Sequence, residues 1–223
     1  MLDKIHQDTY WRLVIRPTRF EQRRIASISG CKKIVEETRI VSPGWQYPYW
    51  DDRSVMAGND WVQLVVDFSQ RMEFWRFYQS AQFVHHMAAV ERFRPARWQP
   101  APPRPIFVEG LIYLMMGLYE FAARMARRGI LDPAAYVAVE LHNTSQRQLI
   151  FWDGWLQAHL GEYVCNVDPI SVVEEEIKAP DLVARTTDLA MEAVVRLCES
   201  FGWFEPPRQL LSALRDRAVQ GRL

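Results

Sequence analysis

The chain has 223 residues, enough for one substantial hydrophobic core, and its 27 Lys and Arg residues balance its 27 Asp and Glu residues. A hydrophobic content of 49% excludes an intrinsically disordered chain, and the zero net charge excludes a strongly basic nucleic-acid-binding protein. Three isolated cysteines argue against a disulfide framework and a zinc site, and they favour a reducing, cytoplasmic location.

The first fifth of the chain predicts two strands around one helix. Residues 10–16 alternate apolar and polar side chains and end at Pro17, which is typical of a strand. Residues 20–37 carry an apolar stripe at helical spacing, and residues 38–41 predict a second strand. The loop 42–52 is punctuated by proline and glycine and holds four aromatic residues. Such a loop can form a binding platform, or it can cover the core.

Residues 60–89 form the densest apolar and aromatic block of the first half and have two interpretations. The run 61–68 is rich in Val, Leu and aromatic residues, which favours a strand. From residue 73 onward, alternation places Arg76, Tyr78 and His86 on the more polar face. Three- and four-residue steps without Gly or Pro also fit a helix. Because aromatic and β-branched residues dominate, we expect strands with a turn near residue 79, which could reverse the faces after it.

The middle of the chain holds an extended connection and a helix. Five prolines within residues 92–105 exclude a helix or a central strand there. Residues 106–128 are apolar almost all round, but Glu109, Glu120 and Arg124 interrupt the run, so we expect a buried helix rather than a membrane span. Gly110 and Gly117 share one face of this helix and permit close approach to a sheet.

The last part of the chain predicts strands and then helices. Residues 136–142 alternate, and we expect residues 148–152 to be their hairpin partner across the turn 143–146. Residues 162–167 predict another strand, and residues 170–173 lead away from it. Two amphipathic helices are expected at residues 180–201 and 208–220, separated by Pro206 and Pro207.

Together these elements predict an α+β fold that forms a single domain over residues 1–223. Its mainly antiparallel sheet has about six to eight strands, consistent with ordinary sheet sizes. The strands fall in two strand-rich halves, 10–91 and 134–173. These halves surround the buried central helix 106–128, and two C-terminal helices follow within residues 180–220.

The titratable residues form no complete catalytic or metal motif. Adjacent His85 and His86 point to opposite faces of a strand, so they cannot chelate one metal together. His142 and Glu140 share a strand face and could act as an acid–base pair or as a structural hydrogen-bonded pair. No phosphate loop, nucleophile elbow, HExxH or CxxC occurs. We therefore predict no catalytic residues, no metal and no cofactor, and we lean away from an enzyme.

Two sets of residues are candidates for binding. Eight basic residues stand against three acidic ones between residues 12 and 39, which is a hint of nucleic-acid binding. The loop 42–52 precedes the central strands and could fold over their polar face, which would suit an anionic or planar ligand. Alternatively, the aromatic residues fill the core and Arg76 pairs with a carboxylate. The nucleic-acid candidates are Arg12, Arg16, Arg19, Arg23 and Arg24; the ligand or partner candidates are Trp45, Tyr47, Arg76, Tyr78 and His86.

Several stretches resemble one poorly characterised family: VIRPTRFEQRRIASISGC, GWQYPYWDD, DWVQLVVDFSQRMEFWRFYQSAQFVHHMA, LYEFAARMA, VELHNTSQRQL and ESFGWFEPPRQLL. Over roughly residues 10–215, the chain resembles the C-terminal region of bacterial proteins that begin with a Schlafen-like AlbA-type nucleic-acid-binding domain. That domain has no counterpart here, so we transfer neither its function nor any catalytic residue.

The resemblance implies an accessory, sensing or interaction module, associated by analogy with bacterial defence or regulation. We expect a non-enzymatic module with a protein partner or a second copy of itself, and no membrane. A nucleic-acid-binding accessory protein is the alternative.

Overall fold

The structure of the protein, a computed structural model, describes residues 1–223 except 43–44, 69–70, 90–104, 153–155, 158–160 and 220–223. Its main sheet has seven strands in the order β12-β9-β1-β7-β6-β5-β4, and all neighbours are antiparallel. The α+β class and the mainly antiparallel sheet are thus confirmed. The strands are β1 (Tyr10–Pro17), β4 (Met56–Ala57), β5 (Trp61–Phe68), β6 (Arg71–Tyr78), β7 (Phe83–Ala88), β9 (Ala134–His142) and β12 (Ile170–Lys178).

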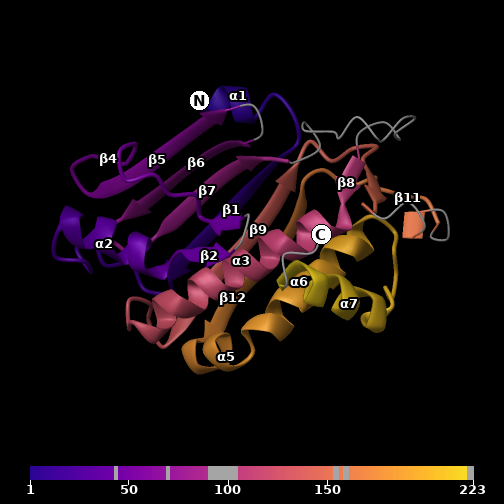
Figure 1. Ribbon diagram of the computed structural model, residues 1–223. Coiled ribbons are helices and arrows are strands. Elements are labelled where there is room, and N and C mark those ends of the chain that lie inside the picture. The colour runs from indigo at the N-terminus through magenta and orange to yellow at the C-terminus, as the bar shows by residue number, and fades with distance from the viewer. Residues whose placement is uncertain (43–44, 69–70, 90–104, 153–155, 158–160, 220–223) are drawn as a thin grey trace.

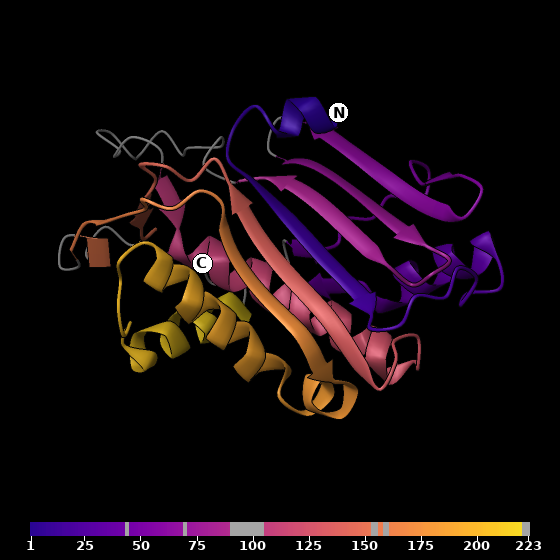
Figure 2. The same cartoon turned by 180° about the vertical axis from the view of Figure 1, so that it is seen from behind.

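Helices cover one face of this sheet, as Figure 1 shows. The helices are α1 (Leu2–Ile5), α2 (Ile28–Thr38), α3 (Val108–Arg127), α5 (Ala179–Ala184), α6 (Thr186–Ser200) and α7 (Arg208–Val219). Seen from behind, the opposite face carries only α1 among the described helices (Figure 2). Two small sheets complete the fold: β2 (Ile40–Ser42) with β3 (Trp45–Tyr47), and β8 (Pro105–Phe107) with β10 (Gln148–Ile150) and β11 (Tyr163–Val164).

Helix α3 is the centre of the covered side, as the apolar run predicts. Most of its side chains are buried, including Leu118 and Phe121, and it contacts α2, α5, α6 and α7. Gly117 admits the aromatic residues of β3: a Cβ at this position would lie 2.8 Å from the ring of Tyr47. At Gly110 the nearest atom to such a Cβ is 3.7 Å away, which is ordinary contact. No helix among the described residues is both long and apolar enough to cross a bilayer.

The strand interpretation of residues 71–88 is confirmed. Strands β6 and β7 are joined by a tight turn, in which Ala81 has a φ of 65°. Phe77 lies opposite Phe83, so the turn does not reverse the faces. Strand β1 lies between β7 and β9 and joins the two strand-rich halves into one sheet.

The predicted hairpin of residues 136–142 and 148–152 is wrong. Strand β9 pairs with β1 and β12, whereas β10 pairs with β8 and β11 in a separate small sheet. The reason lies in the connection, where the Thr144 hydroxyl donates to the carbonyl oxygen of Val167 and the Thr144 amide donates to Asp168. These bonds direct the chain away from its neighbour in sequence.

The predicted helix 20–37 begins eight residues late. Its N-cap is Ser27, whose hydroxyl accepts a hydrogen bond from the amide of Gly30 at 3.0 Å. The preceding residues form an irregular segment, because Arg24 makes an ion pair with Asp132 at 2.9 Å. Phe20, which the helical stripe placed in the core, is 82% exposed.

The C-terminal helices lie where the sequence predicts them, but the first predicted helix is interrupted. The predicted helix 180–201 is two helices, α5 and α6, because Arg185 departs from helical geometry with a φ of −117°. The last helix is confirmed as α7. The predicted connection 92–105 lies outside the described residues except for Pro105, the first residue of β8.

Candidate ligand-binding face

The uncovered face of the main sheet carries the most unusual surface chemistry of the protein. Alternation sends every second side chain of each strand to this face, and the polar and aromatic positions of β1, β5, β6 and β9 share it. One row of residues crosses the sheet from β5 to β9. Trp61 lies opposite Tyr78, and Arg16 lies opposite Tyr136. Gln82 connects the two halves of the row. Its carbonyl oxygen accepts from the Tyr78 amide at 2.9 Å, and continuing the Ile15–Phe83 register by one residue places Gln82 beside Arg16.

Arg76 lies among aromatic rings on this face. Its guanidinium carbon is 4.2 Å from the ring centre of Trp61, 5.4 Å from that of Phe74 and 5.9 Å from that of Tyr78. Its Nε and Nη2 atoms donate to Gln63 Oε1 at 2.9 and 2.5 Å. Within the described part of the chain, no carboxylate pairs with Arg76, so a neutral amide holds the guanidinium and its charge stays uncompensated.

Arg16 has a similar environment at the other end of the row. Its guanidinium carbon lies 4.1 Å from the ring centre of Tyr136, and its Nη1 donates to the carbonyl oxygen of Pro17 at 3.3 Å. Among the residues that the structure describes, Arg16 also lacks a carboxylate partner. Arg12 differs, because its Nη1 lies 2.9 Å from Glu140 Oε1 and its charge is compensated.

A glycine sets the position of Trp61. Gly58 lies so close to the indole that a Cβ there would come within 2.6 Å of its nitrogen. The Gly58 amide also donates to the Trp61 carbonyl oxygen at 2.9 Å. The indole therefore has little room to move away from Arg76.

Three histidines gather where α1 lies on the face. His6 Nε2 is 3.0 Å from His86 Nδ1, and Tyr10 stacks on His6 and on His142 with ring centres 4.1 and 4.6 Å apart. Burial, followed by the charge of His6, lowers the pKa of His86 to about 4. His86 is therefore neutral at pH 7 and adds no positive charge. His142 Nε2 contacts Glu140 Oε2 at 3.0 Å, and Glu140 Oε1 accepts from Arg12. This geometry favours the structural alternative for the His142–Glu140 pair.

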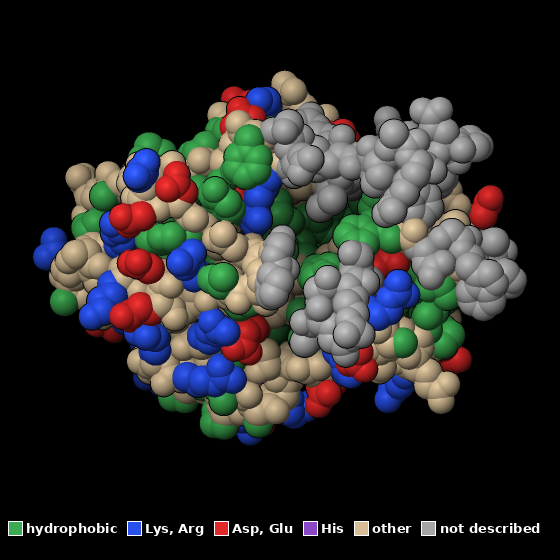
Figure 3. Space-filling view, in the orientation of Figure 1, with side chains coloured by type: hydrophobic (Ala, Val, Ile, Leu, Met, Phe, Trp, Pro, Cys, Tyr) green, Lys and Arg blue, Asp and Glu red, His purple; other side chains and the backbone are tan. Residues whose placement is uncertain are grey.

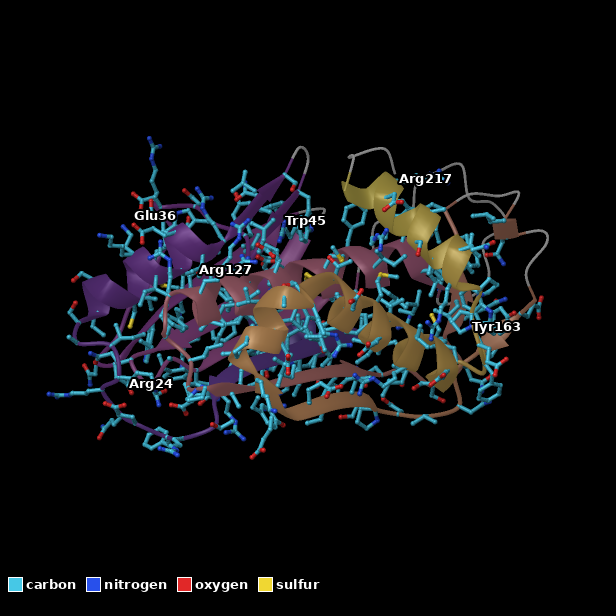
Figure 4. All side chains as sticks on the ribbon, turned by 90° about the horizontal axis from the view of Figure 1, so that it is seen from below. Arg24, Glu36, Trp45, Arg127, Tyr163 and Arg217 are labelled. Carbon is cyan, nitrogen blue, oxygen red and sulfur yellow. The ribbon has the colours of Figure 1, made fainter. Side chains whose placement is uncertain are left out.

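The aromatic loop lies on the opposite side of the sheet from the position we expected. Tyr47 is 1% exposed, and Trp45 packs against Gly117 of α3. Figure 4 shows Trp45 beside this helix. The Trp75 indole holds the loop on this side by donating to the Tyr49 carbonyl oxygen at 2.9 Å. Trp45 and Tyr47 therefore do not meet the three polar candidates of β6 and β7. The predicted common site is wrong. The space beside Gly117 accommodates the rings of Trp45 and Tyr47 on the covered side of the sheet.

A buried charged cluster on the covered face anchors the same loop. Glu73 and His85 are fully buried, and Arg71 Nε donates to Glu73 Oε2 at 2.8 Å. Glu73 Oε1 accepts from the Tyr49 amide at 3.1 Å, and His85 Nε2 lies 3.5 Å from Glu73 Oε2. Burial alone would raise the pKa of Glu73, but the contacts with His85 and Arg71 outweigh it and hold that pKa below its usual value. This cluster stabilises the fold.

The five arginines of the basic segment separate into two groups. Arg12 and Arg16 lie on β1 and reach the uncovered face, whereas Arg19, Arg23 and Arg24 lie in the segment after β1. Figure 4 shows Arg24 far from Trp45. Our sequence reasoning missed two other residues of this face, Trp61 and Tyr136. A usable signal existed for Trp61: it lies two residues after the Gly58-Asn59 turn and opens a strand rich in Val, Leu and aromatic residues.

Nucleophiles and metal ligands give no competing site in the described residues. Burial raises the pKa of the Cys31 thiol to about 11 and that of Cys198 to about 12, so neither forms a thiolate near neutral pH. The described chain also contains no group of three or more His, Cys, Asp and Glu residues placed to hold a metal ion.

Comparison of the chain with protein-family models, with curated proteins and with solved structures found no match. The resemblance to the C-terminal region of the AlbA-type proteins therefore stays a prediction. The function must be inferred from the geometry of the uncovered face.

Proposed function

We propose that the protein is a non-enzymatic binding module whose uncovered sheet face binds an anionic ligand with flat rings. One observation carries this proposal: Arg16 and Arg76 lie over aromatic rings on an open surface, without a carboxylate partner in the described chain. An uncompensated guanidinium attracts anions and presents a planar set of donors. Aromatic rings beside it bind flat groups by stacking and by cation–π contacts.

Unlike Arg16 and Arg76, several cations on the helix-covered side have a carboxylate partner. Lys32 lies 2.7 Å from Asp52, and Arg128 lies 2.5 Å from Glu37. In Figure 3, basic and acidic side chains are interspersed over this side. Their charges are locally balanced, as on an ordinary solvated surface. Arg39 is the exception on this side, because it lies 6.0 Å from the Trp50 ring centre and donates to Gln46 Oε1. The uncovered face differs in carrying two cation–ring pairs, with shorter distances of 4.1 and 4.2 Å.

Binding without catalysis also fits the His142–Glu140 pair. Glu140 contacts both His142 and Arg12, so the carboxylate is committed to two cationic or titratable partners. The resemblance implies a defence or regulatory complex as the setting of this module, and an interaction subunit of such a complex would use the same face.

The proposal can be tested by NMR on the indole groups. We expect the indole N–H signal of Trp61 to shift in a saturable manner when adenosine monophosphate is added at millimolar concentration. Trp75 is the internal control, because it is fully buried on the covered face and donates to the Tyr49 carbonyl oxygen. Its signal should not move.

Matched arginine variants complete this test. Arg76→Ala should abolish the Trp61 shift, whereas Arg127→Ala, which removes a cation from α3, should leave it unchanged. If Trp61 responds neither to the nucleotide nor to a poly-glutamate peptide, the uncovered face is not the binding surface and the proposal fails.

A further inference from the structure

We infer that the ligand of the uncovered face is a single-stranded nucleic acid that crosses the strands of the sheet. This inference rests on the proposed function and adds the class of ligand. The evidence is the arrangement of two cation–ring pairs at separate places on one face. The first is the Trp61–Arg76 pair and the second is the Tyr136–Arg16 pair.

The two pairs are too far apart for one small ligand. Trp61 and Tyr136 belong to the same cross-strand row, on β5 and β9. Four steps between neighbouring strands separate them in the order β5-β6-β7-β1-β9. With the usual strand spacing, the positions of Trp61 and Tyr136 are about 19 Å apart along the sheet, and those of Arg76 and Arg16 are about 10 Å apart. A mononucleotide can therefore stack on one of the two rings but cannot reach both.

A chain of nucleotides matches this distance. An extended or partly stacked single strand covers about 19 Å with roughly three to six nucleotides, near the lower end of known single-strand site sizes. Its phosphates would meet Arg16 and Arg76, and its bases would stack on rings and guanidinium planes. Both cation–ring pairs would then contribute to one binding event, which raises affinity by linking two weak contacts.

The surface between the pairs suits unpaired bases. Val84 and Val14 lie opposite each other on β7 and β1, and Ala138 continues this row on β9. Of these three, only Val84 is partly exposed and offers an apolar contact between the larger aromatic groups, because Val14 and Ala138 are buried. A duplex hides the faces of its bases, whereas a single strand exposes them for stacking. An acidic peptide would meet the arginines but would supply no regular series of flat rings.

The experiment measures fluorescence anisotropy with single-stranded DNA and RNA of 2, 4, 8 and 12 nucleotides. We expect affinity to rise with length up to about six nucleotides and then to level off. With two uncompensated arginines, the slope of log K against log salt should be about −1.4. Arg76→Ala and Arg16→Ala should each reduce that slope to about −0.7 and weaken binding. Trp61→Ala should weaken binding by about 10-fold.

Control measurements keep this inference separate from the proposed function. Arg127→Ala should leave both the affinity and the salt slope unchanged, and circular dichroism should show every variant folded. Equal affinity per site for a mononucleotide and a 12-nucleotide strand would overturn the inference while the proposed function stands. If poly-glutamate binds and neither oligonucleotides nor the mononucleotide do, the inference fails, and of the proposed function only anion binding by this face remains. If the unaltered protein binds neither oligonucleotides, nor the mononucleotide, nor poly-glutamate, the inference and the proposed function both fail.

Discussion

Strand β6 places two kinds of charged side chain on opposite faces of one sheet. On the covered face, the carboxylate of Glu73 is fully buried and is contacted by Arg71, His85 and a backbone amide. On the uncovered face, three residues further along, Arg76 has only a neutral amide and aromatic rings. Removing one member of a buried charged cluster is strongly destabilising, so such a cluster is committed to the fold, while a charge without an opposite partner can act on a ligand.

The largest effect should come from the covered face. Glu73→Ala should lower the free energy of unfolding by about 3–5 kcal/mol, because Arg71 and the Tyr49 amide lose their acceptor inside the protein. Arg76→Ala should cost less than about 1 kcal/mol, because its guanidinium remains partly solvated. Denaturant unfolding measures both values. If both variants lose the same unfolding free energy, the charged residues of the two faces contribute equally to stability, contrary to this comparison.

The next effect concerns the packing of the aromatic loop. Gly117→Ala should destabilise the protein by about 1–3 kcal/mol, since the added methyl group meets the rings of Trp45 and Tyr47. Gly110→Ala is the matched control in the same helix, and it should cause no loss, because its methyl group has room. Thermal unfolding of both variants tests the difference. A stable Gly117→Ala protein would show that the rings of the loop can move.

The smallest effect is a pH dependence from the uncovered face. An unfolded histidine binds a proton near pH 6.5, but folded His86 resists protonation until about pH 4. Between these values the unfolded state holds more protons, so stability should fall as pH falls. After allowance for partial exposure, the loss should be on the order of 1 kcal/mol.

A variant isolates this contribution from that of the carboxylates. His86→Gln should remove part of the decline between pH 6.5 and 4, measured as the difference in unfolding free energy from the unaltered protein. Glu73 also loses its stabilising charge as pH falls through its lowered pKa, but that change is common to both proteins and cancels. Identical pH profiles would show that His86 titrates normally.

Period-two alternation was enough to predict which residues share a face within β6, where it placed Arg76 and Tyr78 together. His86 of β7 joins them because the β6–β7 turn does not reverse the faces, which alternation alone left open. It could not predict that Arg12 and Arg16 join them, because that follows from the pairing of β1 with β7 and β9. Those partners lie about 70 and 125 residues away in the chain, and no local pattern encodes such pairings.

The aromatic loop shows a second limit of sequence reasoning. Its closeness to β5 in the sequence suggested that it would cover the polar face of the central strands. Which side a loop takes depends on where space for its side chains exists, and here Gly117 of α3 supplies that space. A glycine inside a helix predicts close approach, but it does not identify the segment that approaches.

The edges of the main sheet have a consequence for self-association. At one edge, β4 has only two residues; at the other, β12 changes register between Glu174 and Ile177, within a run of three glutamates. A short edge and a bulged, acidic edge are poor templates for adding a strand from another molecule. The bulged, acidic β12 edge therefore disfavours strand addition, whereas β4 pairs only with Val62 and Gln63 and leaves the rest of β5 as the edge where a second molecule would add most easily.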